Sequence, residues 1–219
     1  MRDVFVAADN IFSPIGFTTG ENLNNLKNNI SGIKHHNEIS MSDQPFYASL
    51  FDKNKFPAPT NNITKFEQIL IASISNALED IDIKTSDSKT ILIISTTKGN
   101  ISLLETETYN TETQNRVALH HSAKLVAEHF GFIHRPVIIS NACISGILAI
   151  VTGMRLIRSG QYDHAVIAGA DTISKFVLSG FQSFQAISQK PCKPFDAARD
   201  GINLGEAGAT VVLSCNEKY

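Results

Sequence analysis

Four continuous runs of apolar, largely β-branched residues most narrowly constrain what this chain can fold into. The runs occupy residues 90–95, 136–140, 164–169 and 209–214. Each is apolar along its whole length, whereas a strand with one wet face would alternate with polar residues. A strand that is apolar on both faces must be buried on both, which is typical of parallel sheets covered by helices. The runs therefore predict the strands of one covered sheet.

Helical segments are predicted between these runs. Residues 64–78 and 117–130 carry apolar side chains at helical spacing, and an apolar helix is expected to begin near Ala142. Strands that alternate with helices predict an α/β fold, with a mostly parallel sheet and helices on both faces. With no internal repeat and no linker-like tract, residues 1–219 are expected to form one domain.

The first quarter of the chain is less regular. A strand is predicted over residues 3–8, followed by a turn at Ser13-Pro14 and a polar helix over residues 22–29. Residues 31–62 contain three prolines and little periodicity, so we expect a long irregular excursion there. Excursions of that length in a compact domain are usually functional or packed over another element.

Composition excludes several classes of protein. The 219 residues are 42% hydrophobic and 18% charged, with a net charge of −2, so disorder is excluded and no basic face for nucleic acid is predicted. No apolar stretch approaches the length of a membrane span. Three cysteines without a signal-peptide pattern favour reduced thiols, and we expect a cytoplasmic protein. No spacing typical of a metal site occurs, so no metal is expected.

Cys143 is the candidate nucleophile. It follows the strand predicted over residues 136–140 and lies at or just before the first turn of an apolar helix. The unpaired N–H groups and partial positive charge of a helix N-terminus favour a thiolate there. The same N–H groups could hold the oxyanion that forms when a thioester carbonyl is attacked.

From the local sequence alone, an alternative remains open: Cys143 could be a small hydrophobic core residue, as most free cysteines are. For Cys192 and Cys215 that interpretation is preferred. None of the seven histidines stands in a pattern that ties it to Cys143, and each is expected to be a surface or structural residue. From local residues only, the catalytic set is incomplete.

A series of motifs along the chain points to one family. The motifs are SPIG at 13–16, NISGI at 29–33, NACISG at 141–146, GQYD at 160–163, AGAD at 168–171, GF at 180–181, AIS at 186–188, KPFD at 193–196, RDG at 199–201 and GE at 205–206. In this order they resemble the β-ketoacyl-acyl carrier protein synthases, condensing enzymes of the thiolase superfamily. The resemblance covers nearly the whole chain and corresponds to the N-terminal half of those enzymes.

The resemblance implies a βαβαβαββ half of a five-layer αβαβα fold. It places the acyl-accepting cysteine at Cys143 and an acyl-pocket residue at Phe181, with Asp196, Arg199, Asp200 and Glu206 left to turn and loop architecture. It implies no metal or organic cofactor, and an acyl carrier protein or acyl-CoA thioester as the acyl donor. The family's catalytic histidines, its lysine and a second oxyanion donor belong to the C-terminal half, which we expect condensation to need.

Several positions depart from the family pattern. Ile144 stands beside the nucleophile where the family has a small polar residue, and Ala207 stands where it prefers Gly. Ile202-Asn203 replaces an apolar pair, which could reshape the pocket.

Two other functions remain open from the sequence. The chain could be a non-catalytic structural partner subunit of a complete ketoacyl synthase, although the retained cysteine argues against it. It could also be an unrelated cysteine hydrolase that uses one of the local histidines.

The resemblance also implies partners for the fold. A homodimer is expected through residues 137–140, with residues 100–114 reaching toward the partner's pocket. Pairing with a C-terminal-half or full-length synthase chain is the other expectation, because an isolated N-terminal half should expose an apolar face.

Overall fold

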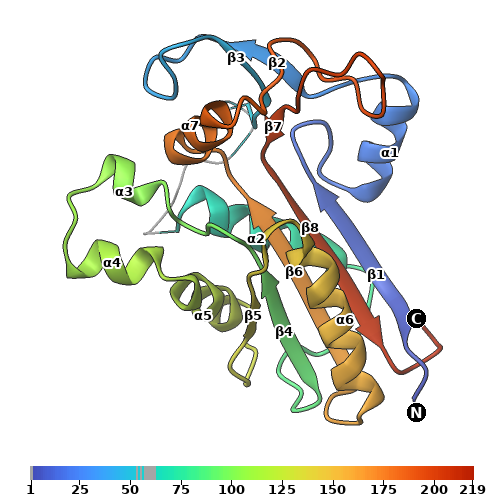
Figure 1. Cartoon of the computed structure of the whole chain (residues 1–219). Coiled ribbons are helices and arrows are strands. Elements are labelled where there is room, and N and C mark those ends of the chain that lie inside the picture. The colour runs from blue at the N-terminus through green and yellow to red at the C-terminus, as the bar shows by residue number, and fades with distance from the viewer. Residues whose placement is uncertain (1, 53, 55, 57–62) are drawn as a thin grey trace.

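The computed structural model describes residues 2–52, 54, 56 and 63–219, and a five-stranded sheet forms its centre (Figure 1). The strands are β1 (Phe5–Phe12), β8 (Ala207–Ser214), β6 (His164–Asp171), β4 (Thr90–Ser95) and β5 (Val137–Ile139), in that spatial order. β4 pairs in parallel with both β5 and β6, whereas β8 is antiparallel to β6 and to β1. The parallel sheet predicted from the sequence is thus the part formed by β6, β4 and β5. The other two strands, β8 and β1, extend it in antiparallel orientation.

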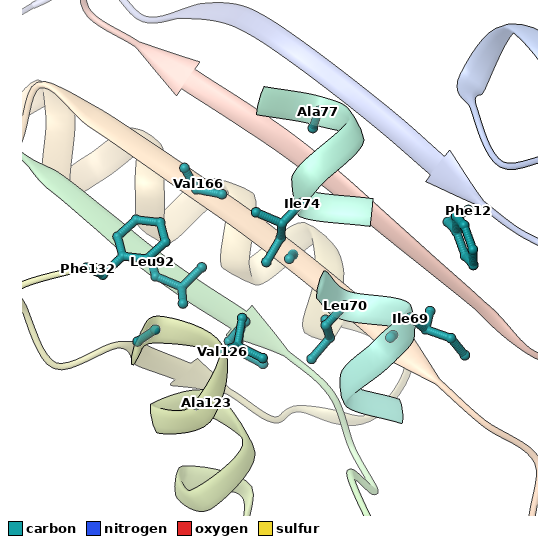
Figure 2. Close-up of a cluster of buried hydrophobic side chains, with 14 of the residues drawn as sticks. Phe12, Ile69, Leu70, Ile74, Ala77, Leu92, Ala123, Val126, Phe132 and Val166 are labelled. Atoms are coloured by element: carbon teal, nitrogen blue, oxygen red, sulfur yellow. The ribbon is translucent and has the colours of Figure 1, made fainter. Parts of the chain in front are cut away.

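Helices cover both faces of this sheet, as predicted. α2 (Lys65–Leu78) and α5 (Leu119–His129) lie on one face. α2 begins at a capping box, in which the Thr64 hydroxyl accepts the Glu67 N–H and the Glu67 carboxylate accepts the Thr64 N–H. Figure 2 shows the resulting core, where Leu70 and Ile74 of α2 face Leu92 and Val166 of the sheet and Ile69 lies toward Phe12. Each such fully buried aliphatic side chain contributes roughly 1.5–3 kcal/mol.

The opposite face is covered by α6 (Ser145–Arg158), which follows the single 3₁₀ turn η1 (Ala142–Ile144). Ala149, Gly153 and Ile157 repeat at every fourth residue and are its buried contacts with the sheet. Gly153 favours close approach, because a Cβ there would lie a tight 3.0 Å from Ile167 Cδ1 and 3.2 Å from Ala165 Cβ. Small residues in α6 therefore let the helix lie close to the strands.

The irregular excursion expected over residues 31–62 is wrong where the structure describes it. It contains β2 (Ile33–His36) and β3 (Phe46–Ser49), which form a second, three-stranded sheet with β7 (Leu204–Gly205). β3 pairs antiparallel with β2 and in parallel with β7. Strands of two to four residues carry too little periodicity to be recognised, and the β3–β7 pairing joins distant parts of the chain. Residues 53, 55 and 57–62, with Pro57 and Pro59, lie outside the described residues.

Other element boundaries shift. β1 extends to Phe12 instead of ending at residue 8, and the polar helix is α1 (Thr19–Lys27). The helix expected over 117–130 is confirmed as α5, and an additional helix, α4 (Thr111–Val117), precedes it. Ala118 separates the two helices because it is extended, with φ −67° and ψ 126°. α3 (Leu103–Thr106) and α7 (Lys175–Ser183) had no counterpart in the prediction. No helix in the described part of the chain is long and apolar enough to cross a membrane.

Candidate active site

The candidate site lies where the three parallel strands end. Ser95 of β4 is in register with Ile139 of β5 on one side and with Gly169 of β6 on the other. The segments that follow these three residues therefore leave the same edge of the sheet side by side. In open α/β sheets, ligands bind at the carboxyl ends of parallel strands.

Cys143 follows β5 in a strained turn. Its neighbour Ala142 has φ +44°, in the left-handed region that a residue with a Cβ seldom adopts. Ser145 holds the turn, since its hydroxyl accepts the Asn141 N–H at 2.8 Å and donates to the Ala142 carbonyl at 2.7 Å. Strain of this kind persists only where surrounding contacts enforce it, and it clusters at functional sites.

The turn presents Cys143 outward. The residue is exposed, its thiol is free, and it lies in η1 directly before α6, as the sequence predicted. The Cys143 backbone N–H makes no hydrogen bond with a described residue. A free N–H beside the nucleophile, at the positive end of a helix, is a suitable donor to an oxyanion.

Cys143 opens into a cavity of about 780 Å³, and Phe181 lines the same cavity. The structure therefore brings together the two site residues that the sequence singled out. Phe176 and Phe181 belong to α7 and Phe184 directly follows it, while β8 contributes Gly208 and Ala209. A volume within the usual range for ligand pockets, with an aromatic wall and small residues opposite, suits an extended, largely apolar group.

The aromatic wall is held by contacts at the N-terminus of α7. The Ser174 hydroxyl accepts the Val177 N–H at 3.2 Å. The Glu105 carboxylate, from α3, accepts the Lys175 N–H at 3.0 Å and the Phe176 N–H at 2.8 Å. Residues 100–114 were expected to reach toward the pocket of a partner subunit. In this chain Glu105, one of these residues, instead holds the aromatic wall of the cavity in the same chain.

A polar group of residues in the cavity was missed by sequence reasoning. Lys98, in the turn after β4, and Asp171, at the end of β6, line the cavity and form an ion pair of 3.3 Å. The Thr96 hydroxyl donates to the other Asp171 oxygen, also at 3.3 Å. Asp171 lies in a family motif and Lys98 lies in none, so only the strand register shows that they meet.

The residues assigned to loop architecture make structural contacts. Glu206 is buried, accepts the Phe51 N–H at 3.1 Å and pairs with Lys65 of α2. Asp200 accepts the Ser188 hydroxyl, and the Asp196 carboxylate accepts the Ala198 N–H. These bonds fix the segment that leads into β7 and β8.

Histidines lie away from the nucleophile. Among the residues that the structure places around the cavity there is none, although all seven histidines are described. His164 opens β6, at the end of the sheet opposite Cys143; burial lowers its pKa, and the nearby Asp163 and Asp87 offset this only in part. Nor does any cluster of His, Cys, Asp or Glu in the described ranges suit a metal ion. Among the described residues that line the cavity there are thus an exposed cysteine, an ion pair and an aromatic wall, but no histidine.

The outward face of α6 is apolar and uncovered. Ile144, Ile147 and Ile150, at successive third positions, are exposed to 54%, 70% and 37%. Near the cavity, Phe176 and Phe184 are also largely exposed. Figure 1 shows α6 lying over one face of the sheet with no element beyond it.

This combination defines an α/β protein with an exposed free cysteine at the carboxyl ends of parallel strands, beside a cavity with an aromatic wall. Over residues 1–218 the sequence matches the family described as "Beta-ketoacyl synthase, N-terminal domain". The chain belongs to this family.

Known proteins agree with that assignment. A putative mitochondrial 3-oxoacyl-[acyl-carrier-protein] synthase of Schizosaccharomyces pombe is 24% identical over 97% of this chain and 58% of its own length. One chain of the complex between the ketosynthase ApeO and its chain length factor ApeC from Xenorhabdus doucetiae gives a TM-score of 0.84 at 20% identity over 98% of this chain. A β-ketoacyl synthase of Burkholderia phymatum gives 0.81 at 21% identity over the whole chain.

The chain spans little more than half the length of these relatives. It covers 58% of the fission yeast protein, 58% of the ApeO complex chain and 60% of the Burkholderia chain. The structural matches confirm the fold, and the family match identifies the half of a ketoacyl synthase to which it corresponds.

Proposed function

We propose that this chain is the N-terminal half of a 3-oxoacyl-[acyl carrier protein] synthase and that Cys143 accepts an acyl group from a thioester. The observation that carries the proposal is the exposed Cys143, on a strained turn, opening into the same cavity as Phe181. Phe181 and the other α7 aromatic side chains would contact the acyl chain. The donor would be an acyl carrier protein or acyl-CoA thioester.

The first half-reaction follows from the geometry of the turn. The Cys143 Sγ attacks the thioester carbonyl, a new C–S bond forms, and the donor's C–S bond breaks. The departing thiolate takes up the proton that Cys143 gave up. During attack, the carbonyl oxygen becomes an oxyanion, which the free Cys143 N–H at the start of α6 is placed to stabilise.

Condensation requires groups that the cavity does not hold. In the family mechanism, malonyl-carrier loses CO₂, the resulting carbanion attacks the acyl-cysteine, and the bond to Sγ breaks. Histidines of the C-terminal half stabilise the thioester oxyanion in that step, and no histidine is among the described cavity residues. We therefore propose that these 219 residues transfer an acyl group but do not condense it without that half.

The outward face of α6 is the proposed contact surface for the C-terminal half. Exposed isoleucines in a row along a helix are unusual in a monomer and mark an interaction surface. The two halves could be parts of one longer chain or two separate chains. Either arrangement would cover Ile144, Ile147 and Ile150.

A second pairing surface is proposed at β5. This strand ends the sheet, with β4 as its partner on one side. An edge strand presents unpaired N–H and C=O groups that can pair with another copy. That position supports homodimerisation through residues 137–140, in the reducing cytoplasm that three free cysteines favour.

The test is intact-mass analysis after incubation with a short acyl thioester. We expect one acyl adduct per chain, lost in Cys143→Ala and kept in Cys192→Ala and Cys215→Ala. The matched cysteine variants exclude nonspecific acylation of surface thiols. An adduct that survives Cys143→Ala would contradict the assignment of the nucleophile.

The alternative function is that of a non-catalytic structural partner subunit of a complete ketoacyl synthase. Absence of any adduct on protein that is folded by circular dichroism would favour it. A stable complex with a full-length synthase would then be the expected finding.

A further inference from the structure

We infer that the acyl group which this site accepts carries a neutral oxygen, a keto or hydroxyl group, along its chain, and that Lys98 and Asp171 recognise it. The inference rests on the proposed function, because it names the substrate class of the same cavity. A fully reduced acyl chain would be the poorer substrate.

The placement of the pair follows from the register of the sheet. Lys98 comes three residues after Ser95, and Asp171 two residues after Gly169, which is paired with Ser95. Cys143 follows Ile139, the neighbour of Ser95 on the other side. Adjacent strands are about 4.8 Å apart, so the pair and the nucleophile leave the same edge within a few strand spacings. All three residues line the one cavity.

Lys98 has hydrogen-bonding capacity to spare. Its ammonium group donates to the Thr97 hydroxyl at 2.6 Å and to the Asp171 carboxylate at 3.3 Å. An ammonium group has three N–H donors, and no further acceptor for Lys98 occurs among the described residues. The third donor is available to a ligand in the cavity.

A fully apolar ligand would bind less favourably beside Lys98 and Asp171. The Lys98 and Asp171 side chains retain 27% and 44% of their exposure, so solvent in the cavity still hydrates them. A saturated acyl chain that filled the cavity would remove that water and leave charged groups with unmet hydrogen bonds, which is costly. A keto or hydroxyl oxygen in the chain would replace the water as an acceptor for Lys98.

The charge balance selects a neutral oxygen over a carboxylate. The Lys98–Asp171 pair has no net charge, and the Thr96 hydroxyl already donates to Asp171. A carboxylate that approached Lys98 would be repelled by Asp171 beside it. A neutral carbonyl accepts from Lys98 without that repulsion.

The experiment compares acylation rates of the 219-residue chain with eight-carbon pantetheine thioesters, followed by intact mass. The set is octanoyl, 5-oxo-octanoyl, 7-oxo-octanoyl and the terminal carboxylate analogue, whose substituents lie far from the thioester and leave its reactivity unchanged. We expect the better oxo isomer to acylate at least about tenfold faster than octanoyl, the fold expected for one hydrogen bond to a charged donor. The carboxylate analogue should not share this advantage.

Three variants test whether Lys98 causes the preference for oxo-acyl chains. Lys98→Met keeps the length of the side chain without its charge and should reduce the oxo preference to within about twofold. Lys98→Arg should keep it. Lys124→Met removes another ion-paired lysine, on α5 and outside this cavity, and serves as the matched control that leaves the preference unchanged.

Binding to Cys143→Ala separates this inference from the proposed function. Non-reactive amide analogues of octanoyl and oxo-octanoyl pantetheine should differ in Kd by the same factor, and Lys98→Met should remove the difference. If the chain were not acylated but kept this binding preference, the proposed function would be contradicted and the inference about Lys98 and Asp171 would stand. Equal binding and equal rates for all chains, or a preference that survives Lys98→Met, would overturn the inference.

Discussion

The position of Cys143 depends on one buried hydroxyl, that of Ser145. The Ser145 hydroxyl accepts the Asn141 N–H and donates to the Ala142 carbonyl, so both bonds reach back across Cys143 to the residues before it. They hold Ala142 at its unfavourable φ of +44°, which aims the cysteine into the cavity. Side-chain bonds that enforce a strained backbone should matter more for reactivity than for the overall fold.

Ser145→Ala is therefore expected to slow acylation of Cys143 by about tenfold, while the free energy of unfolding falls by only about 1–2 kcal/mol for the two lost bonds. Intact-mass kinetics and urea denaturation measure the two quantities. Ser159→Ala, which removes a comparable hydroxyl-to-carbonyl bond at the far end of α6, is the control. Unchanged acylation with reduced stability would show that Ser145 supports the fold and not the nucleophile.

At the scale of elements, the sequence predicts what is long and periodic. Continuous apolar runs located β4 at its observed bounds, and helical spacing located α2 and α6, because each buries a face that repeats regularly. β2, β3 and β7 could not be found, since strands of two to four residues are defined by pairing partners far along the chain. Their presence depends on tertiary contacts.

The site shows the same division between local and tertiary information. Cys143 stands out locally, through the strand and helix beside it, and Phe181 through a family motif. Lys98 has no local signal, and the motif that contains Asp171 does not point to Lys98; the parallel register of β4 and β6 brings the two together. Glu105 likewise lies in an unremarkable polar segment, and its contact with α7 spans 70 residues of sequence.

The α3–α7 contact leads to a prediction about the pocket wall. Glu105→Gln keeps only one of the two acceptor oxygens, so either the Lys175 or the Phe176 N–H loses its acceptor. It also removes a negative charge that stabilises the N-terminus of α7, and together these changes should cost about 1–2 kcal/mol. We expect amides of residues 175–183 to exchange about fivefold faster by hydrogen-exchange mass spectrometry. Glu107→Gln, which breaks the ion pair between Glu107 and Arg116 of α4, should leave that peptide unchanged. Equal exchange in both variants would mean that Glu105 does not hold the wall.

The helices on the two faces of the central sheet differ in how much of their surface is buried. α2 and α5 bury the larger core, whereas α6 is buried only where it touches the sheet. A charged side chain should therefore affect the free energy of unfolding differently on the two faces of α6. Ala149 is fully buried between helix and sheet, and Ile147, two residues earlier, is 70% exposed. A lysine placed at each position distinguishes an outward interaction surface from a buried one.

Ile147→Lys is expected to change the free energy of unfolding by no more than about 0.5 kcal/mol, as exposed substitutions do, and to lower self-association in light scattering and binding of a hydrophobic dye. Ala149→Lys buries an unpaired charge and should cost several kcal/mol or prevent folding. If Ile147→Lys destabilised the chain as strongly as Ala149→Lys, the outward face of α6 would already be covered in solution. With the expected result, that face is free to receive the C-terminal half, and adding that half should then bury it.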